Sequence, residues 1–315
     1  MRRALITGIN GQDGSYLTEL LLREDVEVHG TIRRASLPNL QRIEHLRDKV
    51  KLYWADLSDS SSLFDAVRQS EPDYVFNLGA QSDVRVSFDI PEYVGNVTGL
   101  GAARLLEAVR QVRPDARYYQ AGSSEMFGTN PDVPTNEESA FMPASPYAAA
   151  KVYAYHVTRN YREAYGMHAS NGILFNHESE RRGVEFVTRK ITLGIKEIVE
   201  GRARDIKLGN VTAKRDWGYA PDFVEAMWLM VNAPEPDDYV VATGNTWSVA
   251  DFLERAFSHV DLPWYDHVKH DPILDRPVDP PVLLGDASKA ADKLGWWSKT
   301  DFDTLVKIMV ESDLL

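Results

Sequence analysis

Short apolar runs alternate with amphipathic segments along the first half of the chain. An apolar run bounded by glycine or polar residues predicts a buried strand, and apolar residues that repeat every three or four positions predict a helix. Strands are expected at residues 3–6, 26–32, 52–54, 74–78 and 117–120, with helices at 15–22 and around 63–67 and 103–109. This alternation predicts an α/β fold of the Rossmann type, a doubly wound parallel sheet with helices on both faces.

After about Asn176 the alternation of strand and helix patterns becomes less regular. Charged, turn-rich segments occur at residues 178–183, 213–218 and 272–281, between helical stretches at 223–231 and 251–257 and a strand-like run at 239–243. We therefore expect a first domain at residues 1–175 and a smaller, interleaved α/β lobe at 176–315. Segments near 211–245 are expected to return to the first domain.

Length, composition and charge limit the class of protein. The 315 residues are enough for one large domain or two small ones, and no run of 18 apolar residues predicts a membrane span. The sequence has no cysteine, which excludes disulfides and thiolate catalysis and fits a cytoplasmic protein. A net charge of −12 argues against broad nucleic-acid binding. We expect no metal site, and any anionic ligand has to be held by local arginines and helix N-termini.

Three glycines mark the first expected strand-to-helix turn. Gly8, Gly11 and Gly14 have the spacing G-x-x-G-x-x-G. Glycine permits a tight turn and a close approach of the backbone to a pyrophosphate, and a helix N-terminus adds free N–H groups. An ordinary glycine turn is the alternative, but a strand before and a helix after favour a dinucleotide site.

The end of the second expected strand indicates which dinucleotide is bound. Sites that prefer NAD place an acidic residue there for the ribose 2′-hydroxyl. This strand instead ends in Arg33 and Arg34, and a guanidinium pair suits a 2′-phosphate. The pair therefore predicts NADP, with a solvated basic turn as the alternative.

Four further side chains suggest proton transfer. Tyr147 and Lys151 share a face if their segment is helical, and the ammonium would then lower the pKa of the phenol and make it a general base. A lone Tyr-x-x-x-Lys is often a chance match. Ser123 and Glu125, however, follow the fifth expected strand, at the edge where open α/β sheets bind ligands. A lone loop glutamate is usually a solvated surface group, but here Glu125 is expected to be a second acid/base.

Longer stretches extend the pattern over nearly the whole chain. They include TGINGQDGSYL (7–17), Arg33-Arg34, NLGAQS (77–82) and SPY (145–147). Further on come NGILFNHES (171–179), RRG (181–183), FVTRK (186–190) and AKRDWG (213–218). Together they resemble the extended short-chain dehydrogenase/reductase superfamily and, within it, the GDP-mannose 4,6-dehydratase family. General nucleotide-sugar epimerases share the glycines and the Tyr–Lys pair but not the later stretches.

This resemblance implies a reaction and a cofactor. GDP-mannose would be dehydrated to GDP-4-keto-6-deoxy-mannose without net oxidation, using tightly held NADP as the hydride carrier. Tyr147, assisted by Lys151, would take the proton of the C4 hydroxyl. Glu125 would take the C5 proton, and Glu125 or Ser123 would protonate the C6 hydroxyl that leaves as water.

The resemblance also assigns binding residues. Cofactor contacts are implied for Gly8, Gly11, Gln12, Asp13, Gly14, Arg33, Asp56, Leu57, Leu78, Ala80, Ser82, Tyr147, Lys151, His177 and Arg182. Substrate contacts are implied for Ser82, Ser123, Glu125, Asn176, Val187, Lys190, Arg215, Arg276 and Asp279. From the residues alone, Asn176 could equally be a turn residue, and Arg215 could form a surface ion pair with Asp216. Arg182 and the loop at 33–41 resemble the segment that reaches a neighbour's cofactor in tetrameric members, so a homo-dimer or homo-tetramer is expected.

Some positions depart from the family pattern. Asp83 stands where the family usually has histidine or an apolar residue, and Ser123 where it usually has threonine. Ala144 replaces an arginine, Ala148 a glycine and Asp279 a glutamate. Ser123 and Ala144 leave open a related NADP enzyme that stops at C4, either a 4-epimerase or a 4-keto reductase. A non-catalytic dinucleotide sensor is a third alternative, although a sensor needs no general base such as Tyr147.

Overall fold

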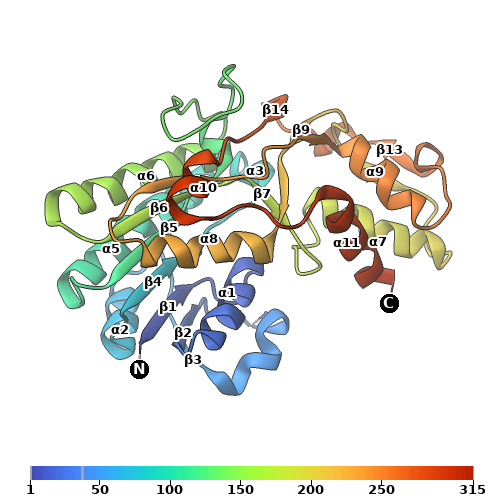
Figure 1. Cartoon of the computed structure of the whole chain (residues 1–315). Coiled ribbons are helices and arrows are strands. Elements are labelled where there is room, and N and C mark those ends of the chain that lie inside the picture. Colours follow the sequence, from blue (N-terminus) through green and yellow to red (C-terminus); the bar gives the residue numbers. More distant parts are fainter. Residues whose placement is uncertain (1, 37–38, 315) are drawn as a thin grey trace.

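A seven-stranded sheet forms the centre of the larger part of the molecule (Figure 1). The computed structural model describes residues 2–36 and 39–314. The strands of the sheet are β1 (Arg3–Thr7), β2 (Glu27–Ile32), β3 (Val50–Trp54), β4 (Tyr74–Asn77), β5 (Arg117–Ala121), β6 (Ala169–Leu174) and β11 (Asp238–Val241). They lie in the order β11-β6-β5-β4-β1-β2-β3, and every neighbouring pair is parallel. The predicted doubly wound α/β fold is confirmed.

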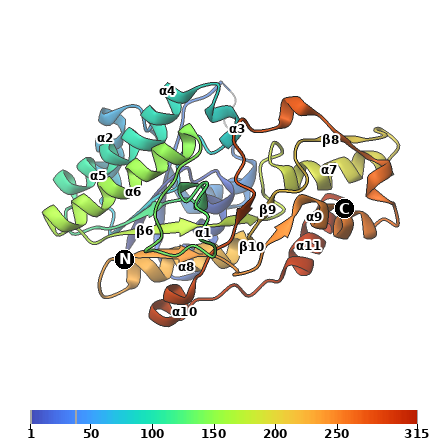
Figure 2. The same ribbon diagram turned by 90° about the horizontal axis from the view of Figure 1, so that it is seen from above.

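Helices cover both faces of this sheet, as the view from above shows (Figure 2). One face carries α1 (Gln12–Arg23) and α8 (Ala220–Asn232), and the other carries α2 (Ser60–Ser70), α5 (Gly101–Val112) and α6 (Pro146–Tyr165). Alternation along β1 explains how both faces become apolar, since successive side chains of a strand point to opposite faces. Ala4 and Ile6 join the core beneath α1 and α8, whereas Leu5 joins the core beneath α2 and α5.

Short elements follow β2, β4 and β5 along the chain. They are the 3₁₀ turns η1 (Gln41–Lys49) and η3 (Ser124–Met126), the helices α3 (Val84–Ser87) and α4 (Pro91–Val94), and the π-helical turn η2 (Gly95–Leu100). Asp83, one of the departures from the family pattern, accepts a 3.0 Å hydrogen bond from the Val86 backbone and so caps α3.

A second, smaller lobe is built around α7 (Val187–Val199), α9 (Val249–Ser258) and α11 (Phe302–Leu314), on the right of Figure 1. Its core includes Ile191, Phe252 and Leu305, all fully buried. Its remaining elements are short: β7 (Asn176–Glu178), β8 (Ile206–Leu208), β9 (Lys214–Arg215), β10 (Trp217–Tyr219), β12 (Trp247–Ser248), β13 (Val268–His270), β14 (Val282–Leu283), and the 3₁₀ turns η4 (Trp264–Asp266) and η5 (Pro272–Leu274). Helix α10 (Ser288–Leu294) packs instead against β11 and α8 of the larger part (Figure 1).

The chain crosses between the two parts more than once. After β10 it returns to the sheet, where β11 pairs with β6. Asp238 at the start of β11 is buried and accepts hydrogen bonds from both guanidinium nitrogens of Arg162 (3.0 and 2.9 Å), from Tyr155 (2.9 Å) and from Asn171 (2.8 Å). This carboxylate therefore joins the returning strand to α6 and β6.

None of the helices in the described part of the chain has the length and apolar character that a membrane span requires.

Asp238→Ala should destabilise the fold, because it leaves the Arg162 charge and two polar groups without their buried partner. Removing one member of a buried ion pair costs about 3–5 kcal/mol. Urea unfolding at neutral pH measures this loss. The matched control is Asp65→Ala, which removes the exposed Arg68–Asp65 pair and should cost less than about 1 kcal/mol. Equal, small losses in both variants would show that Asp238 does not hold β11 in the sheet.

Candidate functional site

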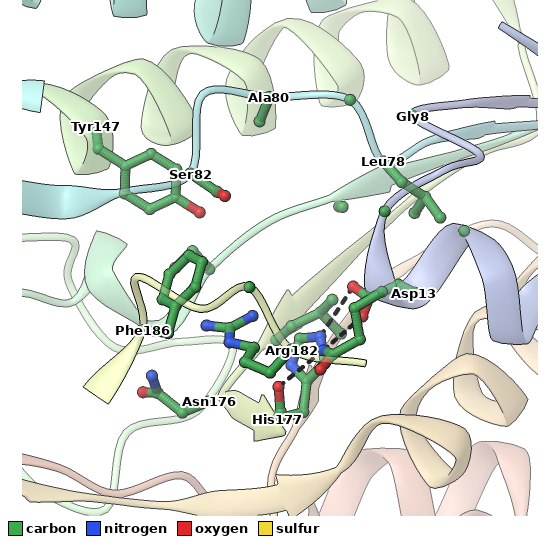
Figure 3. Close-up of a pocket in the computed structure, with 18 of the residues that line it drawn as sticks. Gly8, Asp13, Leu78, Ala80, Ser82, Tyr147, Asn176, His177, Arg182 and Phe186 are labelled. Carbon is green, nitrogen blue, oxygen red and sulfur yellow. Dashed lines mark hydrogen bonds and ion pairs between the residues drawn. The ribbon is translucent and has the colours of Figure 1, made fainter. Parts of the chain in front are cut away.

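The order of the strands reverses between β1 and β4. The connection after β1 leads to β2 on one side, and β4 begins the succession on the other. Ligands of open α/β sheets bind outside the carboxyl ends of the strands at such a reversal. A cavity of about 580 Å³ lies there, with Gly8 and Asp13 at one end and Tyr147 and Ser82 at the other (Figure 3).

The glycine turn forms one wall of this cavity. Gly8 has a φ of +70°, which favours glycine, and a Cβ atom added at Gly14 would lie only 2.5 Å from the Gly8 carbonyl oxygen. Gly11 is the N-cap of α1, and its own N–H donates to the Gly8 carbonyl at 2.9 Å. The result is a closely wound cradle directly before a helix N-terminus, which fits a pyrophosphate group.

A buried ion pair lies beside this cradle. His177 Nε2 is 2.9 Å from Asp13 Oδ2, and His177 Nδ1 is 2.7 Å from the Phe175 carbonyl oxygen (Figure 3). Burial alone would raise the pKa of Asp13, but the charge and hydrogen bond of His177 hold that pKa at about 2. Burial opposes the charge on His177, yet Asp13 raises the His177 pKa above its ordinary value. The pair therefore joins α1 to β7 across the crevice.

The proposed proton-transfer residues lie at the other end of the cavity. Ser145 caps α6 through the Ala148 N–H at 3.1 Å, so Tyr147 and Lys151 both lie in the first turns of that helix. The Lys151 Nζ atom lies 5.7 Å from the centroid of the Tyr147 ring and donates to the Ala121 carbonyl oxygen at 2.7 Å. Ser123, at the end of β5, caps η3 by accepting from the Glu125 N–H at 3.3 Å.

The expected lowering of the Tyr147 pKa is wrong for the chain on its own. Burial raises the pKa of Tyr147 to about 12, although its hydrogen bond with Ser123 acts in the opposite direction. Burial also lowers the pKa of Lys151 to about 8. The spacing correctly places the two side chains on one face, but removal from water opposes the charged form of each group.

Glu125 is not a solvated surface group. Its side chain is buried, and its Oε1 atom accepts a 3.0 Å hydrogen bond from Arg276. Both residues line the cavity, although 151 positions separate them in the sequence. The carboxylate therefore lies in the same cavity as Tyr147 and the glycine turn.

A second cavity of about 620 Å³ adjoins the first and shares Arg276 with it. Asp279 also lines this second cavity and accepts a 2.6 Å hydrogen bond from the buried Arg215. The alternative of a surface pair between Arg215 and Asp216 is wrong, because Asp216 is fully buried and accepts instead from Thr243 and Gly244.

Most of the predicted site residues line the first cavity. The exceptions are Asp56, Leu57, Val187, Lys190, Arg215 and Asp279. Leu57 is buried against Gly101, and Asp56 accepts from Ser58. Asn176 begins β7 and lines the cavity, and its Oδ1 atom has no hydrogen-bond partner among the described residues. That free acceptor favours a binding role for Asn176 over a turn role.

The two arginines after β2 have different surroundings. Arg33 lines the cavity and donates to the Tyr93 hydroxyl at 2.5 Å, whereas the Arg34 guanidinium lies 5.9 Å from the centroid of the Trp54 ring. Only Arg33 lines the cavity, and the reading of a 2′-phosphate by the arginine pair stays a prediction. Leu37 and Pro38, in the loop at 33–41, lie outside the described residues.

Several lining residues were not predicted. Arg42 donates to the Arg181 carbonyl oxygen at 2.6 Å, and the Arg182 guanidinium lies 3.7 Å from the centroid of the Phe186 ring. Phe186 opens the FVTRK stretch but was given no role there, and Arg42 lies in no motif, because it reaches the cavity only through the fold. Within residues 2–36 and 39–314, no three or more His, Cys, Asp or Glu side chains are grouped to hold a metal ion.

Comparisons with known proteins agree with this geometry. The profile of the family described as GDP-mannose 4,6 dehydratase matches residues 5–309. The chain is 54% identical to GDP-mannose 4,6 dehydratase 1 of Arabidopsis thaliana, over 99% of this chain and 89% of that protein. It is 46% identical to GDP-mannose 4,6 dehydratase of Homo sapiens, over 99% of this chain and 91% of that protein.

Solved structures share the fold. The UDP-glucose 4-epimerase of Thermus thermophilus, a complex with NAD, superposes with a TM-score of 0.87 at 25% identity, covering 99% of this chain and 98% of that one. The matched profile and the identity to the two dehydratases over nearly the full length of each chain decide the family. The chain belongs to the GDP-mannose 4,6-dehydratase family.

Proposed function

We propose that this chain dehydrates GDP-mannose to GDP-4-keto-6-deoxy-mannose, with NADP as a cofactor that is restored in each turnover. One observation favours dehydration over oxidation or epimerisation at C4. Buried Glu125 lies in the same cavity as Tyr147 and the glycine cradle. Oxidation or epimerisation at C4 needs one proton-transfer group, whereas loss of water needs a further base for C5 and an acid for C6.

The side chains of the cavity divide the proton transfers between them. Tyr147 takes the proton of the C4 hydroxyl, with Ser123 as its hydrogen-bonding neighbour. Lys151, 5.7 Å from the ring centroid, stabilises the phenolate that forms. Glu125 then takes the C5 proton, which a C4 ketone makes acidic, and Glu125 or Ser123 protonates the departing C6 hydroxyl.

Bound NADP supplies the hydride acceptor for C4 and the hydride donor for C6, together with a positive charge that favours the phenolate. The cradle of Gly8 and Gly14 supports a pyrophosphate site, and the Thermus epimerase with this fold is a complex with NAD. Arg33 supports NADP within that class, because its guanidinium follows β2 and lines the cavity, in the place where an NAD site carries an acid. We assign the other predicted contacts that line the first cavity on the same basis. For Asp56, Leu57, Val187, Lys190, Arg215 and Asp279, the proposed roles rest on the resemblance alone.

We also propose which part of the chain binds the cofactor and which binds the substrate. Residues 1–175 would hold NADP, and residues 176–315 would hold the nucleotide sugar, with the segment near 211–245 shared. The pairing of β11 with β6 supports that sharing. A homo-dimer or homo-tetramer and a cytoplasmic location stay predictions from the sequence.

Incubation of the protein with GDP-mannose and NADP, followed by mass analysis, tests the reaction. The expected product is lighter than the substrate by one water, with no net conversion of the added NADP. An unchanged mass with inverted C4 stereochemistry would identify an epimerase instead, and net consumption of reduced cofactor would identify a reductase.

Tyr147→Phe should abolish most of the turnover, because it keeps the ring and removes the phenolic oxygen that accepts the C4 proton. A loss of about 100-fold or more is expected. NADP binding and the melting temperature should stay near those of the unaltered protein. Near-normal product formation in this variant would remove Tyr147 from the proton transfer.

Arg33→Ala should weaken NADP binding much more than NAD binding, since only NADP carries the 2′-phosphate. A lost charged hydrogen bond is worth about 1.5–3 kcal/mol. Arg34→Ala is the matched control, because the Arg34 guanidinium lies over Trp54, and it should change the NADP to NAD ratio little. Titration of both variants with NADP and with NAD measures the affinities. Equal losses of affinity for NADP and NAD in Arg33→Ala would show that Arg33 does not bind the 2′-phosphate.

Glu125→Gln should separate oxidation from dehydration. The amide keeps the size of the side chain but cannot accept the C5 proton. In heavy water, the unaltered protein should incorporate deuterium at C5 of the product. The variant should oxidise enzyme-bound substrate at C4 yet show neither C5 exchange nor loss of water. A 6-deoxy product formed at the normal rate would rule out Glu125 as the C5 base.

A further inference from the structure

Arg276 belongs to two cavities at once. It lines the cavity that contains Tyr147 and Glu125, and it also lines the adjoining cavity that contains Asp279. Its NH1 atom lies 3.0 Å from Glu125 Oε1 and 3.6 Å from Asp279 Oδ1. A single guanidinium nitrogen therefore connects the proposed acid/base to the wall of the neighbouring cavity.

The charges around Arg276 balance. Arg215 binds Asp279 Oδ1 at 2.6 Å and donates its other nitrogen to the Pro280 carbonyl oxygen at 2.8 Å. Asn210 donates to Asp279 Oδ2 at 3.3 Å. The two guanidinium groups of Arg215 and Arg276 are thus neutralised by the two carboxylates of Glu125 and Asp279. An arriving anion has to share a cation that is already paired.

The Arg215–Asp279 and Arg276–Glu125 ion pairs differ in how far their arginines are exposed to solvent. Arg215 and Asp279 expose 7% and 17% of their side chains, and Arg215 has a further backbone acceptor. Arg276 exposes 29% of its side chain at the rim between the cavities, while Glu125 exposes 8%. An anion that approaches from the second cavity meets the Arg276 guanidinium more readily than that of Arg215, so the Arg276–Glu125 pair is the one it competes with.

We propose that Arg276 is shared between Glu125 and the diphosphate of the substrate, so that arrival of the diphosphate releases Glu125 from its ion pair for proton transfer. This inference rests on the proposed function and adds a coupling to it. A carboxylate paired with a guanidinium is a weaker proton acceptor than a free one. Glu125 would then become an effective base for C5 only when the nucleotide diphosphate is in place, and a free sugar would not trigger the elimination.

Other charged groups face this pair from the elements packed around it. Tyr147 on α6 and Arg215 on β9 act electrostatically with Glu125, and Asp83 before α3 acts on Arg276. Arg215 stays bound to Asp279 while Arg276 turns to the diphosphate. Release of Glu125 therefore removes the ion pair next to the reacting carbon and leaves Asp279 with Arg215 as its partner.

Infrared difference spectroscopy of the NADP-loaded protein tests the coupling. The carboxylate stretching band of Glu125 is assigned by its disappearance in Glu125→Gln. Saturating GDP should move this band, and inorganic pyrophosphate should move it in the same direction, because the anion alone competes for Arg276. Guanosine at saturation should leave the band in place. A band that stays in place with GDP bound, or one that guanosine moves equally, would overturn the inference.

Variants provide a second, independent test. In Arg276→Gln the band should already lie at the released position, and GDP should move it no further. Lys207→Gln is the control, because the Lys207 side chain is exposed and lies outside the lining of both cavities; at saturating GDP it should show the full shift. A full GDP-dependent shift in Arg276→Gln contradicts the sharing of Arg276.

Loss of water from GDP-mannose, measured on the same preparation, separates the two proposals. Water loss together with an unmoved Glu125 band overturns the coupling and leaves the dehydratase in place. Absence of both GDP binding and water loss overturns the proposed function and the coupling together.

Discussion

Charge buried in the crevice between the sheet and the C-terminal lobe has to be paired, and the rest of the site depends on that constraint. Asp13 on α1 is paired with His177 on β7, and Glu125 after β5 is paired with Arg276 from the far end of the chain. In each pair one partner comes from the first half of the chain and the other from the second. Because an unpaired buried charge is costly, these contacts stabilise the closed arrangement of the two halves.

The same constraint shapes the chemistry. Burial raises the Tyr147 pKa to about 12 and lowers that of Lys151 to about 8, so at neutral pH the chain on its own keeps Tyr147 neutral and leaves most of Lys151 protonated. Proton transfer then depends on charges that ligands bring into the cavity. Glu125 follows the same principle if its guanidinium partner is shared with an anion.

Sequence patterns predict the fold well because they report local burial. The apolar runs locate β1, β4 and β5 to within a residue or two, and the return of a strand near residue 239 is confirmed in β11. The helix expected from residue 15 begins at Gln12, since the polar and glycine residues of its first turn contribute nothing to an apolar period. Gly8, Gly14 and the Tyr147–Lys151 face could be predicted because their meaning is contained in one short segment.

The rest of the site could not be predicted, because it arises from contacts over long separations. The Arg215–Asp279 bond spans 64 positions and the Arg276–Glu125 bond spans 151. In neither bond does the sequence around one residue indicate which residue is its partner. The same limit explains the wrong expectation for the Tyr147 pKa: spacing determines which face two side chains share, but the amount of water that the surrounding chain removes is a property of the complete fold.

The central claim is that oxidation at C4 and reduction at C6 occur within one turnover on one substrate molecule. GDP-mannose carrying deuterium at C4 tests it most directly, with the position of the label in the product determined by nuclear magnetic resonance. The account predicts a product that lacks one water and carries the deuterium at C6. Deuterium that remains at C4, or that is found in the pool of added cofactor, would contradict it.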